Sequence, residues 1–163
     1  MKKLAPDVDV INRYNGLTAA IDTIDTTPIF KVAERDYGIK RAEAPQVMDA
    51  LLQWMAAASA DREDERYPQA MLDGDIDNMW HSFILNTKEY RNVCDEVFGE
   101  YFDHEPETAE DEDEDDFQSK IQVKHMLQHL VDSYGVSLNP LLKQWVVSYQ
   151  RWATTYMADL EDD

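Results

Sequence analysis

The chain has 163 residues, of which 15 are basic and 34 are acidic, so its net charge at neutral pH is −19. Because the phosphate backbone dominates the affinity of proteins for nucleic acids, this charge disfavours direct binding to DNA or RNA. The apolar share of 44% is ordinary for a globular protein, so we expect one packed domain over residues 1–163 with extra charge on its surface.

Membrane insertion and disulfide formation are both disfavoured by the sequence. No apolar run approaches the roughly 18 residues of a membrane span, and the lysines near the start have no apolar signal segment behind them. Cys94 is the only cysteine, so an intrachain disulfide is impossible. We therefore expect a cytoplasmic protein without membrane attachment.

Three helices are predicted in the first half of the chain. A short helix is expected within the first 25 residues, and a second one follows Pro28 and ends at Gly38, which suits a left-handed cap. Pro45 fits the first turn of the third helix, and the polar stretch from Asp61 to Tyr67 is predicted to be a loop. The third helix has apolar residues at helical spacing: Val47, Met48, Leu51, Leu52, Met55 and Ala58.

Two motif helices are predicted between residues 75 and 101, with Thr87 as the N-cap of the second. Trp80 lies at the centre of the first apolar stripe, so we expect it to be buried at the junction of the two helices. The first stripe consists of Ile76, Met79, Trp80 and Phe83, and the second of Tyr90, Val93, Cys94, Val97, Phe98 and Tyr101.

An acidic loop is predicted over residues 105–116, because dense like charges repel one another and have nothing apolar to bury. Helices are then expected over residues 117–134, ending at Gly135, and over residues 140–157, beginning at Pro140. No internal repeat is found. The predicted fold class is all-α, a single irregular bundle of about six helices with an acidic loop insertion.

The block from Asp75 to Pro106 is more specific than amphipathic helices require. It resembles the glycine-rich-domain-containing-like proteins of bacteria and plants, whose motif reads approximately D-x-x-W-H-x-H-I-L-x-T-x-x-Y, followed by a cysteine, a glycine and H-x-P. The positions that match in order are Asp77, Trp80, His81, Ile84, Leu85, Thr87, Tyr90, Cys94, Gly99, His104 and Pro106. The chain lacks a glycine-rich tail, and Phe83 stands where those proteins usually have a second histidine.

The resemblance implies a helical module in which Asp77, His81 and His104 belong together, with Trp80, Tyr90, Cys94 and Gly99 as structural positions of the motif. It implies no particular reaction. The loss of the second histidine at Phe83 removes a potential metal ligand.

Two interpretations of Asp77, His81 and His104 remain open from the residues alone. Asp77 and His81 lie one helical turn apart, and a bend at Phe102 and Asp103 would return His104 to them. In one interpretation the three hold a zinc or iron ion with an open coordination position. In the other, Asp77 accepts a hydrogen bond from His81 and the pair braces the two helices.

The remaining chemically capable side chains have simpler predicted roles. His125 and His129 are one turn apart, but they fall on the polar side of their helix and are predicted to be surface residues. Cys94 lies on an apolar stripe, which favours a packed thiol over a nucleophile.

The sequence favours a non-enzymatic interaction or regulatory protein, because it lacks a complete catalytic constellation and its acidic surface suits a partner protein with a basic site. One version is an inhibitor that imitates nucleic acid, as some phage proteins do. The alternative is a small metal-dependent enzyme or metal-binding protein using Asp77, His81 and His104. The candidate partner-binding residues are first the acidic ones, Glu110, Asp111, Glu112, Asp113, Glu114, Asp115 and Asp116. The second candidates form an aromatic ridge, which either packs in the core or binds a partner protein: Trp145, Tyr149, Trp152 and Tyr156.

Overall fold

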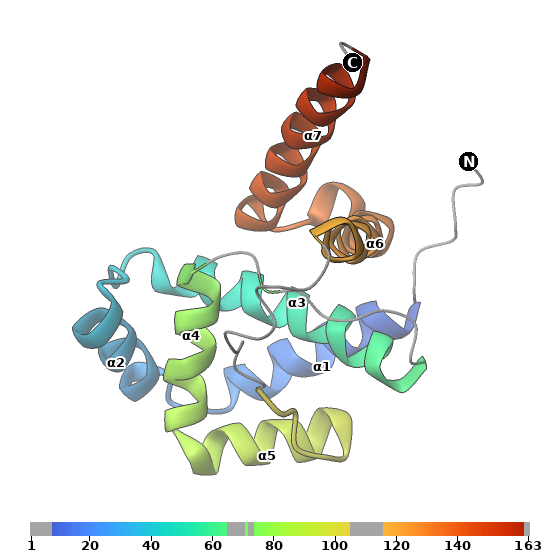
Figure 1. Ribbon diagram of the computed structural model, residues 1–163. Coiled ribbons are helices and arrows are strands. Elements are labelled where there is room, and N and C mark those ends of the chain that lie inside the picture. The colour runs from blue at the N-terminus through green and yellow to red at the C-terminus, as the bar shows by residue number, and fades with distance from the viewer. Residues whose placement is uncertain (1–7, 65–70, 72–73, 105–115, 162–163) are drawn as a thin grey trace.

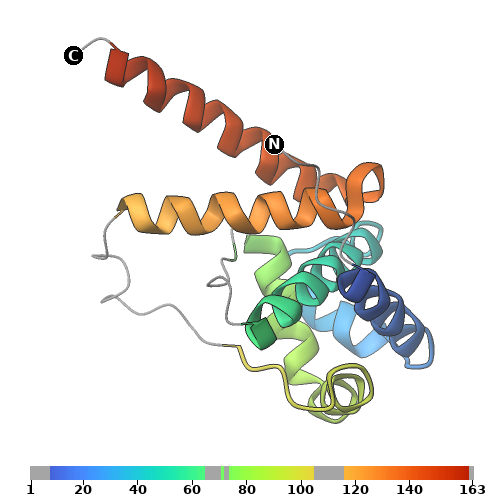
Figure 2. The ribbon, with the colours of Figure 1, turned by 90° about the vertical axis from the view of Figure 1, so that its right-hand side faces the viewer.

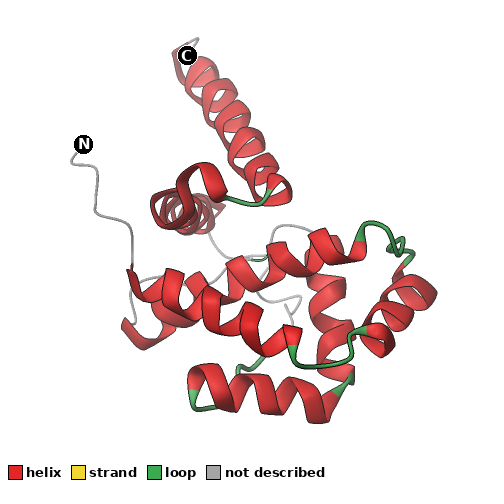
Figure 3. Cartoon of the chain, turned by 180° about the vertical axis from the view of Figure 1, so that it is seen from behind, coloured by secondary structure: helices red, strands yellow, loops and turns green. Residues whose placement is uncertain are grey.

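A computed structural model describes the backbone of residues 8–64, 71, 74–104 and 116–161, and the side chains of 8–61, 71, 74–104 and 123–151. This part of the chain contains seven α-helices, one turn of 3-10 helix and no strand (Figures 1 and 3). The helices are α1 (Val8–Asp22), α2 (Thr27–Tyr37), α3 (Ala44–Asp64), α4 (Gly74–Leu85), α5 (Thr87–Phe98), α6 (Asp116–Tyr134) and α7 (Pro140–Glu161), with η2 (Gly135–Ser137) before α7.

Helix α3 is the centre of the fold. Every residue from Ala50 to Asp61 is buried, as expected for a helix with neighbours on all sides. Helices α1, α4, α6 and α7 all contact it. Small side chains at Ala56, Ala57 and Ala58 let these neighbours approach closely.

Helices α4 and α5 form the corner on which the motif lies. They run in clearly different directions and meet at Asn86 (Figure 1). Helix α2 packs on α4, and α1 packs on α5, so each motif helix is supported by a helix from the first part of the chain. Trp80 is 4% exposed, which confirms its predicted burial.

A buried polar network attaches the last two helices to α3. Asn139, just before α7, donates from its side chain to Asp49 Oδ2 at 2.8 Å, and its backbone N–H donates to Gln53 Oε1 at 2.8 Å. The Tyr134 hydroxyl donates to the backbone carbonyl of Gln53 at 2.8 Å. The Tyr14 hydroxyl donates to the other oxygen of Asp49. Beyond these contacts, α7 extends away from the rest of the molecule (Figure 2).

The structure confirms the all-α bundle and corrects several boundaries. The stretch predicted as a loop from Asp61 is helical as far as Asp64, because Asp61 is buried against α6. The N-cap of α5 is Asn86 and not Thr87, and it makes no side-chain capping bond. Helix α5 ends at Phe98, so Tyr101 lies outside it and is 44% exposed.

Residues 105–115 of the predicted acidic loop, including the candidate partner-binding acids from Glu110 to Asp115, lie outside the described residues. Its last member, Asp116, is the first residue of α6 and not part of a loop. Helix α7 continues to Glu161, beyond the predicted end at residue 157. None of the helices in the described part combines the length and apolarity that crossing a membrane requires.

Candidate metal centre

Two of the three candidate ligands are placed by α4 itself. Asp77 lies in the first turn of α4 and His81 one turn later, so their side chains leave the same face of the helix. Their closest atoms, Asp77 Oδ2 and His81 Nε2, are 3.4 Å apart. A carboxylate in the first turn of a helix is also stabilised by the helix dipole.

The third ligand reaches the site because the chain turns back after α5. Gly99 ends the helix with φ of 72°, in the left-handed region that favours glycine, and its N–H donates to the Asp95 carbonyl. The next residues lead back toward α4, with Phe102 buried and Asp103 exposed. His104 then lies beside α4, as the predicted bend requires.

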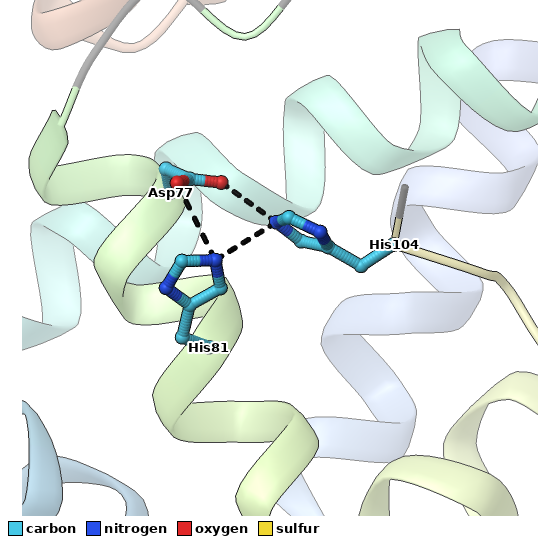
Figure 4. Close-up of side chains that lie close together, drawn as sticks. All are labelled: Asp77, His81 and His104. Carbon is cyan, nitrogen blue, oxygen red and sulfur yellow. Dashed lines mark hydrogen bonds and ion pairs between the residues drawn. The ribbon is translucent and has the colours of Figure 1, made fainter. Parts of the chain in front are cut away.

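The three side chains converge on one point (Figure 4). His104 Nε2 lies 2.8 Å from Asp77 Oδ1 and 2.9 Å from His81 Nε2. One ligand atom from each residue can be chosen so that all three lie within 4.8 Å of one another. Ligand atoms at about 2.0–2.1 Å from one ion in tetrahedral geometry lie about 3.3–3.4 Å apart, so only a small expansion would admit a metal.

The cluster has more hydrogen-bond acceptors than protons to share among them, which suits a cation. If both Nε2 atoms carried protons, His81 and His104 would point N–H at N–H across 2.9 Å, so at least one presents a lone pair. The Asp77 carboxylate adds further lone pairs at 2.8 Å and 3.4 Å. At most one Nε2 proton then serves the three groups, whereas one metal ion would satisfy all three.

The cluster is partly open to solvent. The Asp77 and His81 side chains are 31% and 36% exposed, and that of His104 is 16% exposed. The protein side is formed by the Trp80 ring, whose centroid lies 4.2 Å from that of His104, and by Tyr37 of α2, 6.1 Å from His81. An ion held here would have protein on one side and water on the other.

Phe83, which stands where the resembling proteins have a histidine, lies away from the cluster. It is fully buried, and its ring packs edge-on against Tyr90 at 4.9 Å. Position 83 therefore faces the core, while Asp77 and His81 face the site. The expectation that a missing histidine weakens the ligand set is wrong for this geometry.

Cys94 is fully buried, as predicted for a packed thiol. Burial raises the pKa of its thiol. Its thiol lies beside the Phe102 backbone and the Tyr90 side chain. The sequence predicted a bend at Phe102 but not the burial of its side chain, although an aromatic residue two positions before His104 is a signal for it.

The two histidines of α6 differ from each other. His125 is exposed, as predicted. His129 is not a free surface residue, because its Nδ1 lies 3.0 Å from the buried carboxylate of Asp61 on α3. The pair joins α3 to α6 and belongs to the core.

The predicted aromatic ridge begins in the core. Trp145 is 6% exposed and Tyr149 is half-buried, so the first half of the ridge packs against the bundle. The side chains of Trp152 and Tyr156 lie outside the described residues, although both positions are helical.

Fold and site together define an all-helical protein with an Asp–His–His cluster where a helix meets a returning chain. A protein-family model described as UCP032817-like matches residues 15–134, which is more than half of the chain. The chain belongs to the UCP032817-like family, and the match includes all three residues of the cluster while ending before α7. No curated protein and no solved structure matches the chain.

Proposed function

We propose that this protein binds one divalent transition-metal ion through Asp77, His81 and His104. The observation that carries the proposal is the convergence of one carboxylate and two imidazoles within 4.8 Å. Two imidazoles and a carboxylate suit zinc or iron(II) better than calcium or magnesium, which prefer sets made of oxygen alone. Cys94 takes no part in this ligand set, since it is buried and lies outside the cluster of Asp77, His81 and His104.

The proposed ion would retain an exchangeable position. Three protein ligands leave at least one coordination position free, which distinguishes catalytic metal sites from closed structural ones. The exposure of Asp77 and His81 allows water or a small substrate to occupy that position. The class of function is therefore metal-dependent catalysis or ligand binding, with activation of a metal-bound water as the chemistry the site would supply.

The charge of the molecule supports cation capture. A net charge of −19 attracts cations and repels anions, so it favours metal uptake and disfavours phosphate-bearing substrates. We also propose a relationship to the glycine-rich-domain-containing-like proteins, based on the shared order of Asp77, Trp80, His81 and His104.

Elemental analysis of untagged protein, prepared without chelators and reconstituted with zinc or iron(II), tests the proposal. We expect one equivalent of metal in the wild type and its loss in His81→Ala. His125→Ala is the matched control, because it removes an exposed histidine from α6. Equal metal content in His81→Ala and the wild type, or none in either, would contradict the proposal.

A second candidate function follows from the charge alone. The acidic surface suits a partner protein with a basic site, and an inhibitor that imitates nucleic acid is one form of this. A pull-down from the native host at low and high salt tests it. Capture of basic proteins that salt releases is the expected result, and elution of the protein alone at both salt concentrations would contradict it.

A further inference from the structure

The third ligand differs from the first two in how it is held. Asp77 and His81 keep their spacing because both belong to α4. His104 lies outside any helix, six residues after the end of α5, so its position depends on what fixes the returning chain. The contacts of Phe102 supply that restraint.

The Phe102 backbone is held by one buried hydroxyl group. Tyr90 is fully buried, and its hydroxyl donates to the Phe102 carbonyl at 2.6 Å. The same hydroxyl accepts a hydrogen bond from Trp80 Nε1 at 3.0 Å. A single group thus ties the returning chain to α4, the helix that carries the other two ligands.

Cys94 adds a second restraint from the same face of α5. It lies one turn after Tyr90, is fully buried, and has its thiol beside the Phe102 backbone and the Tyr90 side chain. The Phe102 ring packs against Trp80 at 5.5 Å and against Trp54 at 6.2 Å. Backbone and ring are therefore both fixed.

Fixing Phe102 limits where His104 can go. Two residues extend at most about 7 Å, so the backbone of His104 must lie near the Phe102 carbonyl that the Tyr90 hydroxyl holds. The Trp80 ring, held through Nε1 by the same hydroxyl, then packs on the His104 imidazole at 4.2 Å. The Tyr90 hydroxyl therefore restrains both the backbone position and the ring orientation of His104.

We infer that Tyr90 is the positioning residue of the metal site, and that its hydroxyl, with Cys94, holds Phe102 so that His104 completes the ligand set. This inference rests on the proposed metal-binding function. It also gives a common physical role to Trp80, Tyr90, Cys94 and Gly99. Gly99 allows the chain to turn back, and the other three fix where it returns.

Titration of metal-free protein with Co²⁺, followed by visible absorption, tests the role of Tyr90. Tyr90→Phe removes only the hydroxyl, and loss of an outer partner of a ligand typically lowers metal affinity about 10–100-fold. We expect that loss, together with weaker visible bands as His104 leaves the ion and water replaces it. Circular dichroism establishes that the variant is folded.

Tyr134→Phe is the matched control, because it removes a buried hydroxyl that also donates to a backbone carbonyl, that of Gln53. It should retain wild-type Co²⁺ affinity and spectrum. Equal Co²⁺ affinity in Tyr90→Phe and the wild type would overturn the inference while leaving the metal site intact. If the wild type binds no Co²⁺, the proposed function itself fails and the inference with it.

Cys94→Ala provides the test if Tyr90→Phe does not fold. It removes the sulfur contact with the Phe102 backbone but leaves the Tyr90 hydroxyl in place. A lower Co²⁺ affinity is expected, by a smaller factor than for Tyr90→Phe. A folded Cys94→Ala protein with wild-type affinity would then overturn the inference.

Discussion

The Nε2 atoms of His81 and His104 lie 2.9 Å apart although 23 residues separate the two histidines in the chain. The intervening segment contains the last four residues of α4, all of α5 and the return through Phe102. Each part has a defined restraint: the helical turn spaces Asp77 from His81, Gly99 ends α5, and the Tyr90 hydroxyl ties down Phe102. The convergence is therefore a property of the whole motif.

Trp80→Ala should lower the free energy of unfolding by about 3–5 kcal/mol, as large aromatic-to-alanine changes in a core do. The side chain is 4% exposed and packs between Trp54 at 5.0 Å and His104 at 4.2 Å. Urea unfolding followed by circular dichroism measures the change. Val136→Ala, at a position 93% exposed, should change the free energy by less than about 0.5 kcal/mol. A loss below about 1 kcal/mol for Trp80→Ala would contradict the packing described here.

Asn139→Ala should destabilise the protein by about 2–4 kcal/mol, because it removes a helix cap and leaves buried groups unsatisfied. Asn139 Oδ1 accepts from the Leu141 N–H at 2.9 Å at the start of α7, and Nδ2 donates to Asp49 and to the Gln46 carbonyl. Thermal unfolding measures the loss. Gln144→Ala, an exposed change on α7, is the control and should be nearly neutral. Equal stability of the two variants would show that the network does not anchor α7.

Local patterns predicted most of the helices and the proximity of Asp77 to His81, because both depend on spacing along one helix. They did not predict that Asp61 continues α3, since its polar side chain is accommodated by His129, 68 residues later. The contact of Asn139 with Asp49 across 90 residues is likewise set by packing. The place of Phe102 depends on a hydroxyl from another helix, which no periodicity reveals.

Alkaline pH should destabilise the fold. Burial raises the pKa of both Cys94 and Tyr90 above their ordinary values of 9.0 and 10.0. Above about pH 9 the native state therefore retains protons that the unfolded state has lost, so the free energy of unfolding falls as the pH rises. Urea unfolding at about pH 8 and about pH 10 measures the slope. Cys94→Ala should show a shallower decline, and an unchanged slope would mean that the thiol does not contribute.

Adding zinc to metal-free protein should stabilise it against unfolding, because a ligand that binds only the native state shifts the folding equilibrium. At a free concentration of about 100 times Kd the gain is about 2.7 kcal/mol, which raises Tm by roughly 5–10 °C for a chain of this size. His81→Ala should lose this gain, since only Asp77 and His104 remain, at 2.8 Å from each other. Asp77→Asn should keep part of it, because an amide oxygen is a weaker, neutral ligand.

The control for the zinc effect is His125→Ala, whose exposed histidine lies on α6 and outside the cluster. It should gain as much Tm from zinc as the wild type does. Differential scanning calorimetry with and without zinc measures all four proteins. A zinc-dependent rise in His81→Ala equal to that of the wild type would place the bound ion elsewhere and remove the cluster of Asp77, His81 and His104 as its site.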